Sequence, residues 1–241
     1  MSRMRSLRMP GMQSAYEALL QDKKSIKMSN DEMIAYLIDR EYEDRKEKKI
    51  YRLTKTANFK IMAGLGEIDT SASRGFNRQT LMRLSEMNWL KHAENIIITG
   101  ATGTGKTFIA NALGHTACIN GYPVSYFMMS KLLRKYKEAT VEQTVTKLFK
   151  TIEKKQVLIL DDLGLVPLDK SACRLLYEII DDRYSKSSTI VLSQIPVKLW
   201  SKVFEDKTLG DAIIDRLIHN AHQIELKMER ESKRAERGVV K

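Results

Sequence analysis

The chain reads Gly-Ala-Thr-Gly-Thr-Gly-Lys-Thr at residues 100–107, and this octapeptide decides the fold. It matches G-x-x-x-x-G-K-[ST], the phosphate-binding loop of proteins that use ATP or GTP. The apolar, β-branched run at residues 96–99 before it predicts a buried strand, and residues 108–118 after it have helical composition. A strand, a glycine loop and a helix in this order predict a P-loop nucleotide site.

Each residue type in the loop serves the binding of a triphosphate. Glycines adopt backbone angles closed to other residues, so successive N–H groups can turn toward one centre. The start of the following helix adds unpaired N–H groups and its positive dipole end. We expect Lys106 to reach the β- and γ-phosphates and the Thr107 hydroxyl to bind Mg²⁺. The expected ATP-binding residues are Gly100, Ala101, Thr102, Gly103, Thr104, Gly105, Lys106, Thr107 and Phe108.

Two adjacent acids follow a second apolar run, at residues 157–160. They are predicted to lie at the C-terminal edge of a buried strand, where ligands bind in open α/β sheets. We expect Asp161 to hold Mg²⁺ through water and Asp162 to be the base that orients the attacking water. Neighbours on a strand point to opposite faces, so two acids can serve two purposes. The alternative is a strand end with solvated acids. Many such ATPases carry Glu, one methylene longer, where this chain has Asp162.

A third strand is predicted at residues 189–194 and is ended by Pro196. A polar side chain at its tip could hydrogen-bond the attacking water or the γ-phosphate. Gln194 and Ser193 are the candidates, although a polar residue at a strand end is more often structural.

Arg216 lies among apolar residues at helical spacing, before a short strand-like stretch at residues 223–226. A guanidinium is planar, always charged and bidentate, which suits an arginine that acts on the γ-phosphate of a neighbouring subunit. From spacing alone, the simpler interpretation is an intrahelical ion pair with Asp211, Asp215 or another nearby acid.

The composition of the 241-residue chain favours a polyanionic partner. The net charge is +11, which indicates nucleic acid first and an acidic membrane second. No apolar run approaches the roughly 18 residues that span a bilayer, and no signal-peptide pattern is visible. Cys118 and Cys173 give no metal-ligand spacing and indicate reduced thiols. We therefore expect a cytoplasmic protein with no membrane partner.

The chain divides by composition into a small, helical, basic N-terminal domain at residues 1–70 and an ATPase domain at residues 71–241. Helices are predicted at residues 12–20 and 30–50, and a linker at residues 64–75. Basic residues at helical spacing can follow a phosphate backbone. A solvated helix face is the alternative. The candidate DNA contacts are Arg45, Lys48, Lys49 and Arg52 in the first domain and Lys131, Arg134, Lys135 and Lys137 in the second.

Taken together, these motifs resemble the IstB-type ATPases, the helper proteins of bacterial insertion-sequence transposons, a family close to the DnaC and DnaI helicase loaders. The resemblance spans roughly residues 75–226. The first 70 residues share with the family only the general character of a small, helical, basic N-terminal region. The resemblance is carried by residues 81–90 followed by Glu94-Asn95, the loop at 100–107, LGHTAC at 113–118, LDDLG at 160–164, STIVLSQIPVKLW at 188–200 and DAIIDRLIHNAH at 211–222.

The resemblance implies an α/β AAA+ fold, with a parallel sheet between helices and a reduced C-terminal lid. It implies an ATP-dependent homo-oligomer with ATP bound between subunits, duplex DNA held by the oligomer, and the transposase of the same element as partner. It also implies an arginine finger at Arg216 and a sensor-one residue at Gln194. Arg234 matches the sensor-two position, although MERESKR departs from the family pattern there. The candidate catalytic residues are Lys106, Asp162, Gln194 and Arg216.

The favoured function is that of a DNA-binding ATPase that assists transposition by selecting target DNA and activating the transposase. The alternative is a replicative helicase loader that binds single-stranded DNA. A small-molecule kinase is disfavoured by the tandem acids and the basic charge. A non-catalytic, nucleotide-switched DNA scaffold is the remaining hypothesis.

Overall fold

The computed structural model describes residues 2–21, 28–71 and 75–227. The chain separates into two compact units, Met1–Arg52 and Leu53–Lys241. The domain boundary at residue 70 and the reduced C-terminal lid stay predictions, and Arg234 lies outside the described residues.

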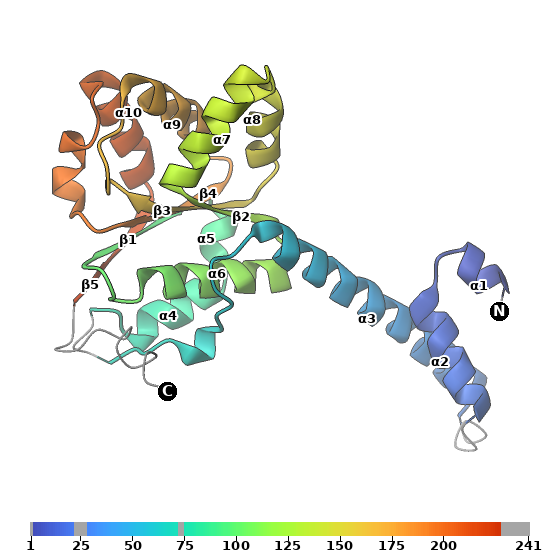
Figure 1. The fold of residues 1–241 in the computed structure, drawn as a ribbon. Helices are drawn as coiled ribbons and strands as arrows, with labels where there is room; N and C mark the ends of the chain where they lie inside the picture. The colour runs from blue at the N-terminus through green and yellow to red at the C-terminus, as the bar shows by residue number, and fades with distance from the viewer. Residues whose placement is uncertain (1, 22–27, 72–74, 228–241) are drawn as a thin grey trace, which may run out of the picture. The chain divides into compact units, whose positions relative to one another are not determined.

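Within the described residues, the second unit is built on one sheet of five parallel strands (Figure 1). The strand order is β2-β3-β4-β1-β5. This order puts the strand that precedes the phosphate loop beside β4, and the strand that ends in the two acids on the other side of β4. The α/β fold with a parallel sheet is confirmed. The strands are β1 Asn95–Gly100, β2 Val124–Met128, β3 Val157–Leu163, β4 Ser188–Ser193 and β5 Ala221–Leu226.

Alternate residues of the central strands enter two different apolar clusters. In β1, Ile96 and Ile98 belong to one cluster and Ile97 to the other. β3 and β4 alternate in the same way. Because both faces of a parallel sheet are covered by helices, its strands are apolar throughout rather than alternating with polar residues. This explains why Ile96, Ile97 and Ile98 of β1 follow one another without a polar residue between them.

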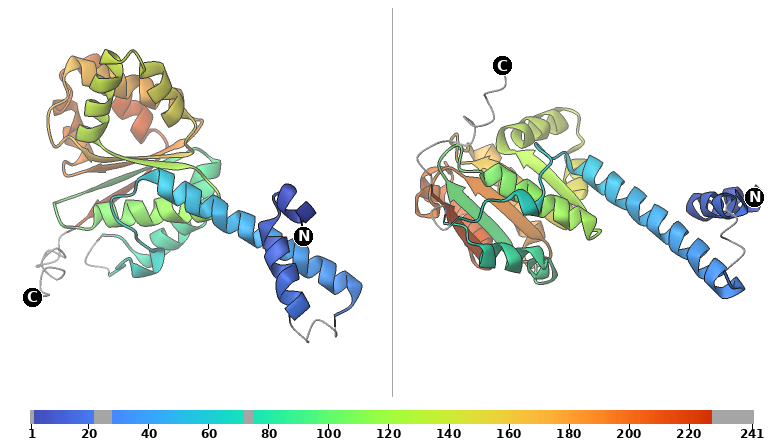
Figure 2. Two further views of the ribbon diagram at one scale, coloured as in Figure 1. Left: turned by 45° about the vertical axis from the view of Figure 1, so that its right-hand side comes forward. Right: turned by 90° about the horizontal axis from the view of Figure 1, so that it is seen from below.

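Helices cover the two faces of the sheet as separate layers (Figures 1 and 2). The helices α4 and α6 lie on one side, and α7 to α10 lie on the other. The bounds are α4 Arg78–Ser85, α5 Asn88–Lys91, α6 Lys106–Ile119, α7 Met129–Val141, α8 Val145–Glu153, α9 Lys170–Arg183 and α10 Lys207–Ile218, with short 3-10 helices η2 Leu65–Glu67 and η4 Val197–Lys202.

The described part of the expected linker packs against the sheet unit. Ile68 is buried in the apolar cluster on the α6 side of the sheet, and Leu65 packs against that cluster. Ala63, the residue before the expected linker, is buried in the same cluster. Glycine-rich and polar composition predicted a loop here, but these apolar side chains anchor it. Phe59 also approaches this cluster closely, since a Cβ on Gly114 of α6 would lie 2.7 Å from its Cε1 atom.

The first unit contains α1 Ser2–Ser6, α2 Pro10–Gln21 and most of α3 Asn30–Ala57, up to Arg52. The buried carboxylate of Glu41 joins α2 to α3, because it accepts from the Met12 N–H at 3.1 Å and pairs with Arg45 at 2.6 Å. A Cβ on Gly11 would lie 2.6 Å from the Arg40 carbonyl oxygen, so the two helix backbones approach closely there. The helix predicted at residues 30–50 extends to Ala57.

None of the described helices combines the length and the apolar character that a membrane-spanning helix needs.

Candidate ATP-binding site

The phosphate loop connects β1 directly to the first turn of α6. Gly103 has φ of 87° and Gly105 has φ of 92°, in the left-handed region that favours glycine. Gly105 is the N-cap of α6, which begins at Lys106. The unpaired N–H groups of the first helical turn therefore open into the loop, where an anion is stabilised.

Lys106 places a positive charge inside this loop. Lys106 is 7% exposed as a residue. Its Nζ atom donates to the carbonyl oxygens of Gly100 at 2.6 Å and Ala101 at 2.8 Å. The ammonium is thereby held next to the loop amides. This arrangement fits the binding of the phosphates of ATP.

The loop and the end of β3 are joined through Asp161. Its Oδ2 atom accepts from the Thr107 hydroxyl at 2.9 Å and from the Tyr126 hydroxyl at 2.6 Å, and the residue is 1% exposed. Mg²⁺ is bound in proteins by oxygen ligands, commonly one or two from the protein. The hydroxyl of Thr107 and the carboxylate of Asp161 therefore fit the expected magnesium site.

Tyr126 is a member of this site that sequence reasoning missed. It lies in β2, which pairs with β3 so that Tyr126 is opposite Ile159, two residues before Asp161. Burial first, and then the hydrogen bond and charge of Asp161, raise the pKa of Tyr126 above its usual value. The hydroxyl therefore stays protonated and acts as a donor. The available signal was one hydroxyl-bearing ring in a mostly apolar strand.

Asp162 does not continue the regular strand. Its φ is 63°, and the pairing of β3 with β4 is shifted between Leu160 and Leu163. Asp and Asn tolerate this left-handed conformation better than most residues because a short polar side chain can hydrogen-bond locally. The regular strand geometry that we assumed at the second acid is therefore absent, and the separate roles of Asp161 and Asp162 stay predictions. The left-handed backbone at this position therefore suits an Asp.

The tip of β4 reaches the phosphate loop through Gln194. Its Oε1 atom accepts from the Thr102 hydroxyl at 2.7 Å. Ser193, the other candidate at this tip, is buried and donates to the Leu163 carbonyl at 2.8 Å, so it serves the backbone instead. The C-terminal ends of β1, β3 and β4 thus bring Lys106, Asp161 and Gln194 to one edge of the sheet.

Arg216 lies at the opposite edge of the sheet, where β1 begins. Its carbonyl oxygen accepts from the side chain of Asn95, the first residue of β1, at 3.2 Å, whereas the phosphate loop follows the last residue of β1. The Arg216 Nε atom pairs with Asp181 of α9 at 2.9 Å. Its guanidinium lies 5.0 Å from the centre of the Tyr177 ring. The intrahelical pair with Asp211 or Asp215 is therefore replaced by a pair with an acid of another helix.

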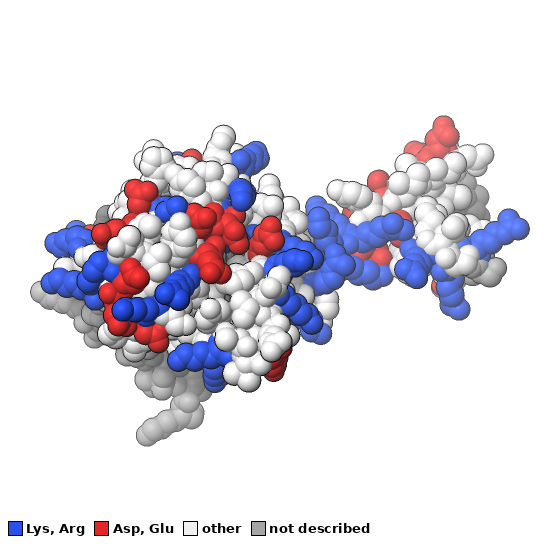
Figure 3. Space-filling view, turned by 90° about the horizontal axis from the view of Figure 1, so that it is seen from above, with Lys and Arg blue, Asp and Glu red and all other residues white. Residues whose placement is uncertain are grey.

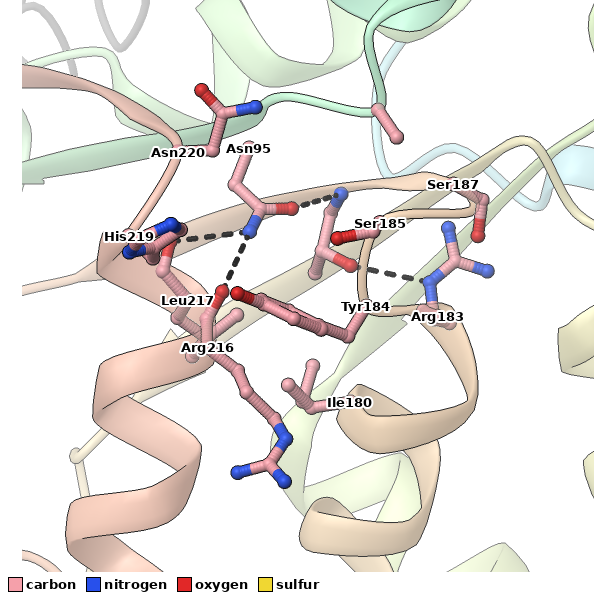
Figure 4. A pocket seen from close by; sticks show the side chains of 12 residues that line it. Asn95, Ile180, Arg183, Tyr184, Ser185, Ser187, Arg216, Leu217, His219 and Asn220 are labelled. Atoms are coloured by element: carbon pink, nitrogen blue, oxygen red, sulfur yellow. Dashed lines mark hydrogen bonds between the residues drawn. The ribbon is translucent and has the colours of Figure 1, made fainter.

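Arg216 also lines a cavity of about 210 Å³ at this edge of the sheet (Figure 4). In Figure 4 its guanidinium points away from Asn95. The cavity is lined mainly by polar side chains from the ends of α9, α10, β1 and β4.

The candidate DNA contacts on α7 are exposed. Arg134 lies 3.8 Å from Glu138, and Lys135 Nζ lies 5.6 Å from the centre of the Phe127 ring. Figure 3, which looks onto the side of α7 to α10, shows red acidic groups among the blue basic ones. The exposed basic residues of α7 are Lys131, Arg134, Lys135 and Lys137.

The basic candidates of the first unit are partly paired within α3. Arg45 pairs with Glu41, and Lys48 pairs with Asp44 at 2.7 Å. Lys49 and Arg52 are exposed.

The class of protein follows from the parallel sheet, in which β4 lies between the strand that precedes the glycine loop and the strand that carries the two acids, and from the loop that opens into a helix. These features define an ATPase of the AAA+ P-loop class. Within that class, the chain belongs to the family of IstB-like ATP binding proteins, which it matches over residues 2–238.

Individual relatives agree with this family. The chain is 34% identical over 226 residues to the insertion-sequence ATP-binding protein y4pL of Sinorhizobium fredii, covering 94% of this chain and 92% of the relative. It is 36% identical over 197 residues to the ATP-binding protein of insertion sequence IS1162 from Pseudomonas fluorescens, covering 81% and 85%. The crystal structure of the DnaC helicase loader matches with a TM-score of 0.57 and 22% identity, over 68% of this chain and 97% of that one. At this identity, the last likeness shows the fold alone.

Proposed function

We propose that this ATPase forms an ATP-dependent homo-oligomer on duplex DNA. In this proposal it assists transposition by selecting the target DNA and activating the transposase of the same insertion sequence. The observation that carries the assembly is the separation of Arg216 from the phosphate loop. From Asn95 to Gly100, β1 extends about 17 Å at roughly 3.3 Å per residue. That distance exceeds the reach of an arginine side chain, so Arg216 serves the nucleotide of a neighbouring subunit.

Phosphoryl transfer asks a protein mainly for positioning and charge neutralisation. In the proposed mechanism, the loop amides and Lys106 bind the phosphates. Thr107 and Asp161 would hold Mg²⁺, which supplies further neutralisation of phosphate charge when bound. Asp162 orients the attacking water and accepts its proton, and Gln194 contacts the water or the γ-phosphate. Arg216 of the neighbouring subunit stabilises the negative charge of the transition state.

The DNA partner is supported by the net charge of +11 and by the exposed basic residues of α7. Lys49 and Arg52 of α3 are further candidates. The transposase partner is supported by the relatives, which are named as insertion-sequence proteins. These partners would place the protein in the cytoplasm. Phosphate contacts release counterions, so DNA binding by this protein should weaken as salt is added.

The test is fluorescence anisotropy with labelled duplex and single-stranded DNA, each with ATP, ADP or no nucleotide. Tight duplex binding that requires ATP, and that is lost in Lys106→Ala, would support the proposal. The fold of the DnaC helicase loader gives the alternative a specific basis. Preference for single-stranded DNA would favour that alternative, and no DNA binding in any nucleotide state would refute both.

A further inference from the structure

Asn95 connects the end of α10 to the sheet. Its Nδ2 atom donates to the carbonyl oxygens of Arg216 at 3.2 Å and Leu217 at 3.1 Å. Its Oδ1 atom accepts from the Thr189 N–H of β4 at 2.9 Å. Figure 4 shows these bonds as dashed lines that meet at one side chain, which is 9% exposed as a residue. One amide therefore ties three elements together next to the cavity that Arg216 lines.

The position of these bonds determines their effect. The last four carbonyl groups of an α-helix have no partner within the helix. Of these, Asn95 satisfies the carbonyls of Arg216 and Leu217, while the Asp215 carbonyl accepts from the His219 N–H at 2.9 Å. Helix ends otherwise fray at little cost in free energy. Asn95 thus fixes the backbone from which the Arg216 side chain extends.

Asn95 is held rigidly because Thr189, whose N–H donates to it, is itself held by a further hydrogen bond. The Thr189 hydroxyl accepts from Nε of Arg183 at 3.1 Å. The guanidinium of Arg183 is buried and also donates to the carbonyls of Lys155 at 2.8 Å and Ser188 at 2.6 Å. A continuous set of hydrogen bonds therefore runs from α9 through β4 and β1 to the end of α10.

The side chain of Arg216 is held by a different set of contacts, with Asp181 and Tyr177 of α9. Those contacts compete with any phosphate for the guanidinium, so they must open when Arg216 acts on a nucleotide. The bonds from Asn95 go to backbone carbonyls and have no such competitor. They can persist in the working state, and they are the ones that determine where the guanidinium can reach.

We propose that Asn95 is a positioning residue for Arg216. It contacts no nucleotide and acts by holding the last turn of α10 in the geometry that a neighbouring subunit's γ-phosphate requires. The inference rests on the proposed action of Arg216 across the subunit boundary. A misplacement of about 1 Å in a positioned group can cost about 100-fold in rate. We therefore expect Asn95→Ala to lower kcat by about 10- to 100-fold, with ATP affinity unchanged.

Two variants and one control isolate this effect. Asn95→Ala removes all the side-chain bonds. Asn95→Asp keeps the shape and the acceptor for Thr189 but loses the donor to α10, so it should lower kcat in the same way even if Asn95→Ala folds poorly. Asn220→Ala is the matched control, because Asn220 is exposed and lines the same cavity. It should keep the parent kcat.

The deciding measurement mixes each variant with Asp162→Asn protein, which supplies an intact Arg216 but cannot hydrolyse its own ATP. Mixing should restore hydrolysis in the sites of Asn95→Ala or Asn95→Asp subunits, because a neighbour now provides a positioned arginine. Mixing Asn95→Ala with Arg216→Ala should restore nothing. A merely structural defect would not be repaired by a neighbour.

The outcomes separate this inference from the proposed function. If Asp162→Asn restores Arg216→Ala but neither Asn95 variant, or if both Asn95 variants keep the parent kcat, the positioning role is overturned. If Asp162→Asn fails to restore Arg216→Ala itself, the action of Arg216 across the boundary is refuted, and the inference falls with it.

Discussion

Replacing Tyr126 with Phe removes one hydroxyl group, which donates to the buried carboxylate of Asp161 at 2.6 Å. A hydrogen bond to an ionised group contributes about 1.5–3 kcal/mol to stability. For a domain of this size, each kcal/mol shifts Tm by about 2–4 °C, so we expect Tyr126→Phe to unfold about 3–12 °C below the parent protein.

The same change should weaken the metal dependence of nucleotide binding. Asp161 would keep the hydrogen bond from Thr107 and lose the shorter one, so its carboxylate would be less firmly oriented. Loss of such an outer partner commonly costs about 10- to 100-fold in metal affinity. The Mg²⁺ concentration for half-maximal binding of a fluorescent ATP analogue should rise by a similar factor, while binding without Mg²⁺ should change little.

Thermal unfolding followed by circular dichroism, and nucleotide titration at a series of Mg²⁺ concentrations, measure the two effects. Tyr122→Phe is the matched control. Among the described residues, the side chains that donate to Asp161 are those of Thr107 and Tyr126, and Tyr122 is not one of them. A fall in Tm for Tyr126→Phe no larger than that for Tyr122→Phe would refute the stabilising role of the bond. An unchanged Mg²⁺ requirement would refute the orienting role.

Four further outcomes are expected. Burial, and secondly Asp161, raises the pKa of Tyr126 in the folded protein, so on raising the pH the unfolded chain loses the Tyr126 proton before the folded protein does. The contribution of Tyr126 to stability is therefore complete below about pH 10 and declines above that pH. In urea unfolding, the difference in stability between the parent and Tyr126→Phe should narrow above that pH, and a constant difference would contradict the assignment. Asp162→Val should lower the unfolding free energy by about 1–2 kcal/mol more than Asp162→Asn, because a β-branched residue is strained at this positive φ; equal stabilities would argue against the left-handed backbone. Gly11→Ala should speed hydrogen exchange across α2, since overpacking costs about 1–3 kcal/mol, and slower exchange would mean that α2 packs differently. Cys118 should resist alkylation in the native protein at neutral pH, because it is buried and burial raises its pKa to about 11; rapid labelling without unfolding would disprove its burial.

The elements around the phosphate loop were predictable because their signals are local. The β-branched run of β1, the glycines at 103 and 105 and the helix after them each constrain the backbone at their own positions. The acids at the end of β3 were predictable for the same reason, since an apolar run that ends in carboxylates indicates a strand tip. The fold is confirmed, and the roles of the individual site residues stay predictions.

The contacts that complete the site depend on strand order, which spacing along the chain does not encode. Tyr126 meets Asp161 only because β2 pairs with β3. Asn95 reaches a carbonyl group 121 residues later in the chain, and Arg216 pairs with Asp181 rather than with an acid of its own helix. The left-handed backbone of Asp162 arises where the pairing with β4 shifts, so no local pattern could have indicated it.

The parallel direction of the described strands gives the protein a polarity. One edge of the sheet carries the phosphate loop, and the opposite edge carries Arg216. In the proposed assembly, one subunit's arginine edge must therefore meet the next subunit's loop edge, which is a head-to-tail contact rather than a two-fold one. Head-to-tail contacts close into a ring only if the rotation between subunits permits, and otherwise continue as a helix. Every open assembly would thus end in one subunit whose ATP has no arginine beside it, so nucleotide at that end would outlast nucleotide in the interior.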